Sequence, residues 1–456
     1  MAEAAALEGA REEIERLGAI RIRVEIPDTD GNLRGKYTSA AKLLKGKGAT
    51  LSDVFYVLSI RDDVYEAPVT GVSTGFPDVV GMPDWSTLRP VPWERDLCAV
   101  IVDMHTKRGE PLGVDSRLAL RRAEARAAEM GFEARFGVEY ELYLFHGGEE
   151  GDRALRAGRP RDLRSVGREW HAYSLWRFAD MDSFVAEVDG QLREYGIEIE
   201  AWSTELGFGM IECAIAPLSP LAAADAAARF KLACKQLAKR HGLIASFIAK
   251  WDMAQSGSSG HLHQSLLRDG GNVFWGGEQD TLSETGRHYL GGLLAFAPEL
   301  SVFSTPNVNS YRRPSPELWA PTNASWGFDN RQAAVRAITL EEASARFEYR
   351  RPGADLNPYL AIASCLDSGL EGIRGGVEPP PDSPGPAFDD PNATPYPATL
   401  DAAAEALDAS SLAREWYGDE LVTHYVVSRR AEAEYVRRIA NAQVPDYELT
   451  RYLETA

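Results

Sequence analysis

Two glutamates stand two residues apart in GVEYELYLF, residues 137–145, a stretch that is otherwise mostly apolar and aromatic. Side chains at positions i and i+2 of a β-strand lie on one face. We therefore expect Glu139 and Glu141 to point one way, and Tyr140 and Leu142 the other. Burying an unpaired carboxylate costs much free energy, so this strand predicts a positively charged group in front of the two glutamates.

Three further segments place charged or imidazole side chains on elements of period two. They are His261 and His263 in SGSSGHLHQSL, Arg346, Glu348 and Arg350 in ARFEYRR, and Glu200, Glu205 and Glu212 in the expected hairpin over 196–216. Each alone has an ordinary explanation: a solvated face, a satisfied core histidine or a surface salt-bridge ladder. Together, five glutamates and a histidine suit hard divalent cations such as Mg²⁺ or Mn²⁺. Two such ions flanked by arginines are typical of phosphoryl transfer.

Composition narrows the class of protein. A chain of 456 residues predicts two domains. Its net charge of −19 argues against non-specific binding to nucleic acid or to an anionic membrane. The four cysteines lack C-x-x-C spacing, which fits a reducing cytoplasm. The N-terminus does not read as a signal peptide, and no apolar run suits a membrane helix. Phosphate loops of the P-loop and dinucleotide types are also missing.

The elements that must position these residues can be expected from pattern and punctuation. The N-terminal part predicts a helix over 1–18, a hairpin over 20–38, an ordered loop over 71–92 and a strand over 98–105, forming a small α+β domain. Beyond it, helices are expected over 116–130, near 180–195 and over 220–242. Residues 375–398 read as a proline-rich surface linker, and the last 60 residues look helical.

The chain resembles the glutamine synthetase family along nearly its whole length. The matching blocks follow the family's order: GVEYELYLF, the hairpin over 196–216, GSSGHLHQSL, PNVNSYRRPSPELWAPTNASW, DNRQAAVR, RFEYRRPGADLNPYLAIASCLDSGL and VPDYELTRYLE. The resemblance implies an α+β fold, with an N-terminal β-grasp domain (1–110) and a large catalytic domain (111–456) built round a curved antiparallel sheet. It also implies a homo-oligomer, a dodecamer of two hexameric rings, with active sites between neighbouring subunits.

The resemblance also implies roles for particular residues. One metal ion would be held by Glu141, Glu205 and Glu212, and a second by Glu139, His261 and Glu348. The ATP side would comprise Glu200, His263, Ser265, Arg331, Arg336 and Arg346. L-Glutamate would meet Gly257, Arg313 and Arg350. The family's chemistry implies that ATP phosphorylates the glutamate γ-carboxylate before an amine attacks, with Arg331 and Arg346 stabilising the moving charge.

The sequence departs from the family's pattern where glutamine synthetases bind ammonium. Trp319 fills the slot of a flap glutamate, and the Phe-Asp-Gly-Ser-Ser loop is missing, with Asp53 as a possible stand-in. Met210 and Ser256 stand where Gln and Asn are common. The pattern resembles the family's amine-ligase branch, which joins glutamate to a larger primary amine. We expect Trp319 to line the amine pocket, and Glu212 or Asp53 to take the amine's proton.

Two alternatives stay open at this point. One is an ordinary glutamine synthetase with a divergent ammonium site, and the other is a non-catalytic, ring-forming structural or regulatory relative. The second would not need to keep six metal-ligand positions. Thr394 matches the tyrosine that bacterial glutamine synthetases adenylylate, so we do not expect that regulation here.

Overall fold

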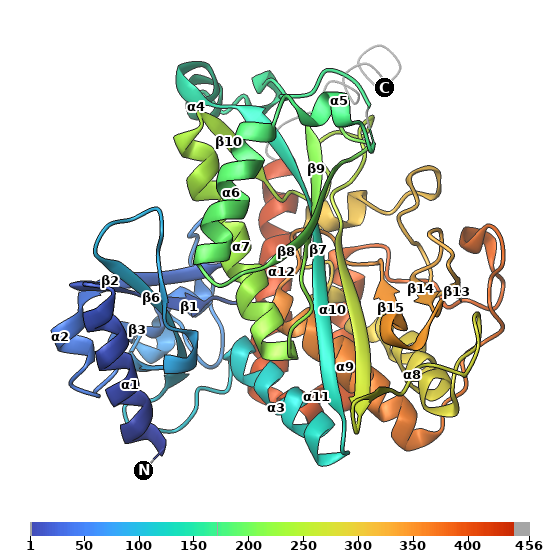
Figure 1. The fold of residues 1–456 in the computed structure, drawn as a ribbon, viewed down its shortest axis with the longest axis horizontal. Coiled ribbons are helices and arrows are strands. Elements are labelled where there is room, and N and C mark those ends of the chain that lie inside the picture. The colour runs from blue at the N-terminus through green and yellow to red at the C-terminus, as the bar shows by residue number, and fades with distance from the viewer. Residues whose placement is uncertain (1, 171, 442–456) are drawn as a thin grey trace.

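Two β-sheets organise the protein, which is described by a computed structural model for residues 2–170 and 172–441 (Figure 1). The N-terminal sheet has the strand order β2-β1-β6-β4-β3, with β5 also paired to β6. Its strands are β1 (Arg21–Pro27), β2 (Leu33–Ser39), β3 (Ala49–Ser52), β4 (Asp78–Pro83), β5 (Arg89–Pro90) and β6 (Leu97–His105). β1 runs antiparallel to β2 and parallel to β6, an arrangement that agrees with the predicted β-grasp fold.

The N-terminal helix and hairpin form where the sequence predicts them. Helix α1 (Ala2–Arg16) buries Ala10 and Ile14 in the same core cluster as Ile22 and Val24 of β1. The turn between β1 and β2 needs a glycine at position 31. Its φ is +76°, and an added Cβ would lie 2.8 Å from Cδ of Pro358, so both the backbone and the neighbouring chain exclude a side chain.

The expectation of a loop over 71–92 is wrong in its middle. Residues Asp78–Pro83 form β4, which lies between β3 and β6. Gly81 allows the close approach of this strand, because an added Cβ would lie 2.6 Å from Cγ2 of Val102 on β6. The glycines and prolines that suggested a loop thus serve a closely packed strand.

The larger sheet carries the residues of chemical interest. Its strand order is β13-β14-β15-β11-β7-β9-β8, with β10 paired to β7 and β12 to β11. The strands are β7 (Glu133–His146), β8 (Ile199–Thr204), β9 (Met210–Ile215), β10 (Leu243–Ser246), β11 (Gly260–Arg268), β12 (Gly271–Asn272), β13 (Trp326–Phe328), β14 (Val335–Ile338) and β15 (Arg346–Tyr349). Apart from the parallel pair β13–β14, neighbouring strands are antiparallel.

The two faces of β7 differ as its alternation predicts. Val138, Tyr140, Leu142 and Leu144 are all buried in the main core. Tyr140 stacks on Phe230 of helix α7 (Pro220–Arg240), with ring centroids 5.8 Å apart. Helix α7 therefore covers the face of β7 opposite to the one that carries Glu139 and Glu141.

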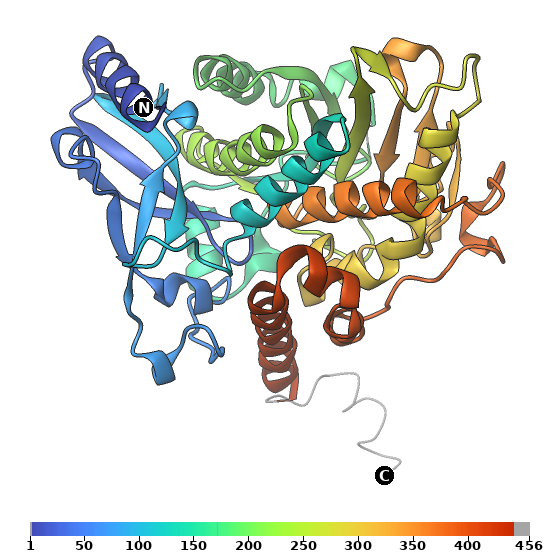
Figure 2. The same cartoon turned by 90° about the horizontal axis from the view of Figure 1, so that it is seen from below.

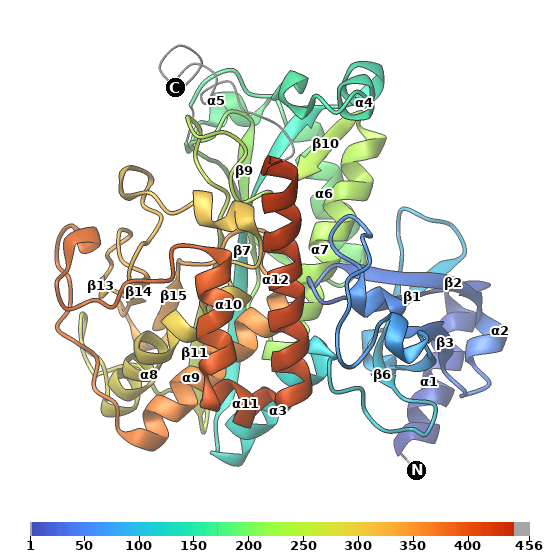
Figure 3. The same ribbon diagram turned by 180° about the vertical axis from the view of Figure 1, so that it is seen from behind.

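Further helices complete the chain. They are α2 (Ala40–Leu43), α3 (Ser116–Glu129), α4 (Gly148–Arg156), α5 (Leu175–Phe178), α6 (Asp182–Glu194), α8 (Glu284–Leu300), α9 (Pro358–Gly375), α10 (Leu400–Ala409), α11 (Ser411–Tyr417) and α12 (Asp419–Asn441). Seen from below, the N-terminal part lies to one side of the remainder (Figure 2). From behind, α12 runs between α10 and the N-terminal sheet (Figure 3). The block 444–454 lies outside the described residues. Among the helices that are described, none has the length and apolar character to cross a bilayer.

Candidate active site

Cross-strand register brings most of the predicted metal ligands together. The directly opposed pairs are Glu141–Glu212, Glu139–His261 and His263–Glu348. Side chains opposed in this way have Cβ atoms about 4.5–5.5 Å apart, and Glu205 adds its carboxylate from the β8–β9 turn. We call this set the carboxylate cluster: Glu139, Glu141, Glu205, Glu212, His261, His263 and Glu348.

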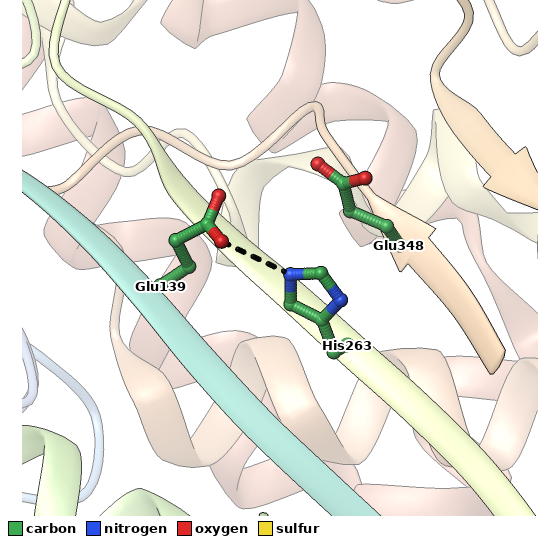
Figure 4. A group of neighbouring side chains, drawn as sticks. All are labelled: Glu139, His263 and Glu348. Carbon is green, nitrogen blue, oxygen red and sulfur yellow. Dashed lines mark ion pairs between the residues drawn. The ribbon is translucent and has the colours of Figure 1, made fainter. Parts of the chain in front are cut away.

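One half of the carboxylate cluster is paired internally. His261 Nδ1 lies 2.8 Å from Glu139 Oε1. His263 Nε2 lies 3.4 Å from Glu139 Oε2, the ion pair that Figure 4 marks. Burial raises the pKa of Glu139, but hydrogen bonds to the two imidazoles outweigh it and hold that pKa well below its usual value. This carboxylate is therefore ionised.

Arginines satisfy the cluster at Glu348. Arg336 Nη1 donates to Glu348 Oε2 at 2.9 Å, and the guanidinium of Arg350 pairs with Glu348 Oε1. Glu348 is only 1% exposed. Burial opposes its ionisation, yet the charges of Arg350 and His263 lower its pKa to about 2.

The other half of the cluster has no such compensation. In the described part of the chain, no basic side chain lies within 4.0 Å of the carboxylates of Glu141, Glu205 or Glu212. Burial, together with the charge of Glu141, raises the pKa of Glu205 to about 8. Burial and the charges of Glu139 and Glu141 raise the pKa of Glu212 to about 10. These carboxylates lack a cation.

A divalent cation fits this donor set. Three groups bring one ligand atom from each member within 4.8 Å of the others: Glu141–Glu205–Glu212, Glu139–Glu212–His261 and Glu139–His263–Glu348. His261 Nε2 is also buried without a hydrogen-bond partner. Carboxylate oxygens with an imidazole suit Mg²⁺ or Mn²⁺.

The ligands expected at the first metal ion lie in one group, whereas those expected at the second are spread over two groups. Glu141, Glu205 and Glu212 form one group, as the resemblance implies. Glu139 belongs to one group with Glu212 and His261 and to another with His263 and Glu348. His261 nevertheless touches both, since its Nδ1 lies 3.5 Å from Glu348 Oε1. The assignment of each ligand to one ion stays a prediction.

A large pocket adjoins the carboxylate cluster. Its volume is about 930 Å³, and it is lined by Glu139 and by four residues expected on the ATP side: Glu200, His263, Ser265 and Arg346. Arg346 Nε donates to His263 Nδ1 at 3.2 Å. Ligand pockets commonly measure about 300–1,000 Å³. Arg336 contacts Glu348 of the carboxylate cluster. The backbone carbonyl of Arg331 accepts a hydrogen bond from Arg350 Nε at 3.0 Å.

The residues expected to meet glutamate lie together. An added Cβ at Gly257 would lie 2.6 Å from Cγ of Arg313. Arg313 is 3% exposed, and its guanidinium donates to Ser259 Oγ at 2.8 Å and to backbone carbonyls of Arg350 and Arg351. Its Nε is buried without a partner. Burial lowers the pKa of Arg313 to about 10. Among the described residues, no carboxylate lies within 4.0 Å of its guanidinium.

Trp319 and Asp53, which were predicted to lie near the amine, do not belong to the carboxylate cluster of the same chain. Trp319 ends a short turn with φ +54° and is 48% exposed, and no ring contact or hydrogen bond ties its indole to the cluster in the described residues. Asp53 is 4% exposed in the N-terminal part, where burial raises its pKa. Neither carboxylate nor indole belongs to the three metal groups.

Sequence reasoning missed Tyr173. Its backbone N–H donates to the carbonyl of Thr204 at 2.9 Å, which places it beside the turn that carries Glu205. Burial raises the pKa of its hydroxyl, and the charges of Glu205 and Glu212 raise it further. Its ring is 73% exposed. The only signal was a cluster of aromatic residues in a loop, which has no diagnostic spacing.

Comparison with known proteins gives the class first. The glutamine synthetase catalytic domain matches residues 113–452. The chain therefore belongs to the glutamine synthetase family, as a ligase whose pattern lies with the glutamate–amine ligase branch.

Three particular proteins are similar over nearly the whole chain. A glutamate–isopropylamine ligase of a Pseudomonas species is 36% identical, covering 97% of each chain. A gamma-glutamylethanolamide synthetase of Streptomyces coelicolor is 32% identical, covering 94% of this chain and 91% of its own. A solved GmaS/ADP complex has a TM-score of 0.83 at 25% identity, covering 97% of this chain and 99% of that one.

Proposed function

We propose that this protein joins the γ-carboxylate of L-glutamate to a primary amine at the expense of ATP. The observation that carries the proposal is the combination of a complete carboxylate cluster with Trp319 at the slot where glutamine synthetases hold a glutamate. The similar proteins named for isopropylamine and ethanolamide products support the same class of substrate. An ordinary glutamine synthetase is the alternative that the experiment below addresses.

The nucleotide would occupy the pocket beside Glu139. Glu200, His263, Ser265 and Arg346 line it, and the similarity to a GmaS/ADP complex supports this placement. Arg346, Arg336 and Arg331 would meet the phosphates, where guanidinium forks bind oxyanions through charge-assisted hydrogen bonds. In phosphoryl transfer most catalysis is positioning and charge stabilisation.

Divalent cations would be held by the carboxylate cluster. The residues that would bind them are Glu139, Glu141, Glu205, Glu212, His261 and Glu348. When bound, two such ions supply charge neutralisation to these carboxylates and to the phosphoryl group. Glu348 is also paired with Arg336 and Arg350, so this chain fixes one ligand before any ion arrives.

Glutamate would bind between Gly257, Arg313 and Arg350. Arg313 is a buried cation without a carboxylate partner in the described residues, which suits it to grip a carboxylate of the substrate. The absence of a side chain at position 257 lets the backbone lie against the stem of Arg313, since an added Cβ would lie 2.6 Å from its Cγ. The γ-carboxylate oxygen is a poor leaving group, so transfer of the ATP γ-phosphoryl group would give γ-glutamyl phosphate, ADP being released. Attack by the amine then forms the amide and releases phosphate.

The amine would approach from the side of Trp319 and Tyr173. Both rings are exposed, at 48% and 73%, and Tyr173 lies beside Glu205 and Glu212. An amine must lose a proton as it attacks, and Glu212 is the acceptor that we assign within this chain. Asp53 is the second candidate, from a neighbouring subunit.

We also propose that the chain assembles as its family resemblance implies. Two hexameric rings would place the N-terminal domain (1–110) of one subunit beside the catalytic domain (111–456) of the next. Light scattering of the purified protein tests this, with a dodecamer as the expected result. A stable monomer with full ligase activity would contradict the shared site.

The deciding experiment measures ADP formation with glutamate, ATP, Mg²⁺ or Mn²⁺ and a panel of amines that includes ammonium. The panel should hold isopropylamine, ethanolamine, aniline and a polyamine at equal concentrations. We expect at least one primary amine to be turned over faster than ammonium, with the γ-glutamylamide identified by mass spectrometry. If glutamine forms fastest, the protein is an ordinary glutamine synthetase.

A further inference from the structure

A second pocket lies behind the large sheet, between the turn that joins β1 and β2 and helix α7. Its volume is about 370 Å³, and its charged lining residues are Asp28, Arg34, Asp62, Lys231 and Lys235. Lys231 Nζ lies 5.6 Å from the ring centroid of Tyr140. Since Tyr140 points away from Glu139 and Glu141, this pocket is separated from the carboxylate cluster by strand β7.

The acidic groups of this pocket already have partners. Asp28 is 2% exposed, and its carboxylate accepts hydrogen bonds from the backbone N–H groups of Asp30 and Asn32. Arg34 Nε donates to Asp28 Oδ2 at 2.8 Å, and Arg34 Nη1 donates to Asp62 Oδ1 at 2.7 Å. The positive charge of Arg34 is therefore paired with the carboxylates of Asp28 and Asp62.

The two lysines have no such partners. Lys231 is 7% exposed, and Nζ of Lys231 and of Lys235 lie 5.7 and 6.0 Å from the ring centroid of Phe247. Within residues 2–170 and 172–441, no carboxylate lies within 4.0 Å of either ammonium group. The lysines are four residues apart on α7, where like charges repel. Lys235 is exposed, but Lys231 is buried, and a buried ammonium without a close counter-charge is costly.

We propose that this pocket binds a small oxyanion of the size of inorganic phosphate, with Lys231 and Lys235 as its cationic ligands. An ammonium group binds phosphate as a compact point charge with several donors. The pocket has room for such an anion and for water, since one water occupies about 30 Å³ of the liquid. The anion would supply a counter-charge in direct contact with the two lysines, which the described carboxylates do not give within 4.0 Å.

The charge state of Lys231 agrees with this reading. Burial, followed by the charge of Lys235, lowers the pKa of Lys231 to about 7, although the charges of Asp355, Asp28 and Asp30 act in the opposite direction. A bound anion would favour the protonated amine and so oppose both effects.

Calorimetric titration with inorganic phosphate, at constant ionic strength in chloride, tests the proposal. The full-length protein is compared with Lys231→Met, which keeps the apolar stem and removes the charge, and with Lys235→Gln. Lys239→Met is the matched control, because Lys239 is on the same helix and does not line the pocket. Arg346→Met reports on phosphate bound in the nucleotide pocket instead. Sulfate and succinate distinguish a tetrahedral oxyanion from a carboxylate, and a thermal melt checks that each variant is folded.

We expect Lys231→Met and Lys235→Gln each to weaken phosphate binding about tenfold or more, since each removes a charge-assisted contact. Lys239→Met and Arg346→Met should retain it, and succinate should bind more weakly than sulfate. The proposal is overturned if Lys231→Met binds phosphate as the wild type does, or if only Arg346→Met loses the binding. Neither readout depends on ligase turnover, so the proposed function stands or falls separately.

Discussion

Two buried clusters of charge in this protein are built in opposite ways. The Arg117 cluster consists of Arg117, Arg121, Asp84, Asp103 and Asp225 and joins the N-terminal sheet to helices α3 and α7. Arg117 is 1% exposed and donates to all three aspartates, and the hydroxyl of Tyr359 donates to Asp225 at 2.9 Å. Every carboxylate in it faces a donor from the same chain.

The carboxylate cluster leaves three of its members without a cation within 4.0 Å from the described residues. Glu141, Glu205 and Glu212 face one another, and the pKa values of Glu205 and Glu212 rise to about 8 and about 10. In the Arg117 cluster, by contrast, burial opposes ionisation of Asp84 but hydrogen bonds and the guanidinium of Arg117 lower its pKa. Satisfied charges thus hold the fold together, whereas unmatched charges indicate where a ligand belongs.

The largest effect on stability should come from Arg117→Met. It leaves buried Asp225 and part-buried Asp84 and Asp103 without their shared donor, and breaking a buried pair costs about 3–5 kcal/mol. Urea unfolding measures the change. Arg121→Met is the control, because Arg121 bonds the same Asp84 and Asp103 from a side chain 41% exposed and should cost about 1 kcal/mol or less. Equal losses of unfolding free energy in both variants would show that the buried and the half-exposed arginine stabilise the fold equally.

The largest effect on activity without loss of fold should come from the carboxylate cluster. Alanine at each of Glu139, Glu141, Glu205, Glu212, His261 and Glu348 should lower turnover by about 10²-fold or more, because charge stabilisation by a metal ion is worth several kcal/mol. Glu212→Gln sharpens the comparison. Glutamine has nearly the same size as glutamate and cannot repel Glu139 and Glu141, so the chelator-treated variant should melt no lower than the wild type. Near-normal turnover in any two of the alanine variants contradicts the two-metal site.

A smaller and more selective effect is expected at Arg313. Arg313→Lys keeps the charge but loses the planar fork. The Michaelis constant for glutamate should rise about tenfold, while the constant for ATP changes little. Steady-state kinetics with each substrate varied in turn gives both values. A parallel rise for ATP would place Arg313 outside the glutamate pocket.

The smallest effect should be a change of preference at Trp319. Trp319→Glu introduces a carboxylate where the wild type has none, so it should raise the rate with ammonium relative to the best amine. Loss of apolar contact, at about 0.8 kcal/mol per methylene of the amine, should lower the rate with larger amines. The ratio of the two rates at equal concentration is the measurement, with Trp319→Phe as the control. An unchanged ratio in Trp319→Glu would show that the indole lies away from the amine.

The local alternation of residue types predicted which side chains share a face better than it predicted which residues stand opposite them across the sheet. The alternation of β7 places Glu139 and Glu141 on one face, because a strand permits nothing else. Which histidine stands opposite Glu139, however, depends on the register of β7 and β11, and that register is set by packing across the sheet. The structure places His261 opposite Glu139 and within 3.5 Å of Glu348, and which ion each ligand binds stays a prediction.

Composition misled the prediction where long-range contacts decide the structure. Residues 71–92 look like a loop, yet β4 is held between β3 and β6 because Gly81 admits Val102. Tyr173 carried no diagnostic signal, since its position depends on a hydrogen bond to Thr204 of a later strand. The Arg117 cluster could not be foreseen either, because its members come from positions 84 to 225.

The position of β7 within the large sheet restricts insertions and deletions in residues 133–146. Strands pair with β7 on both sides, and its two faces serve the carboxylate cluster and the packing against α7. Removing one residue between Gly137 and Glu139 would exchange the faces, sending glutamates into the aromatic core and Tyr140 towards the ligand. Insertions and deletions should therefore be absent from residues 133–146 in active relatives, and should collect in surface segments such as 375–398, where the structure shows little regular secondary structure.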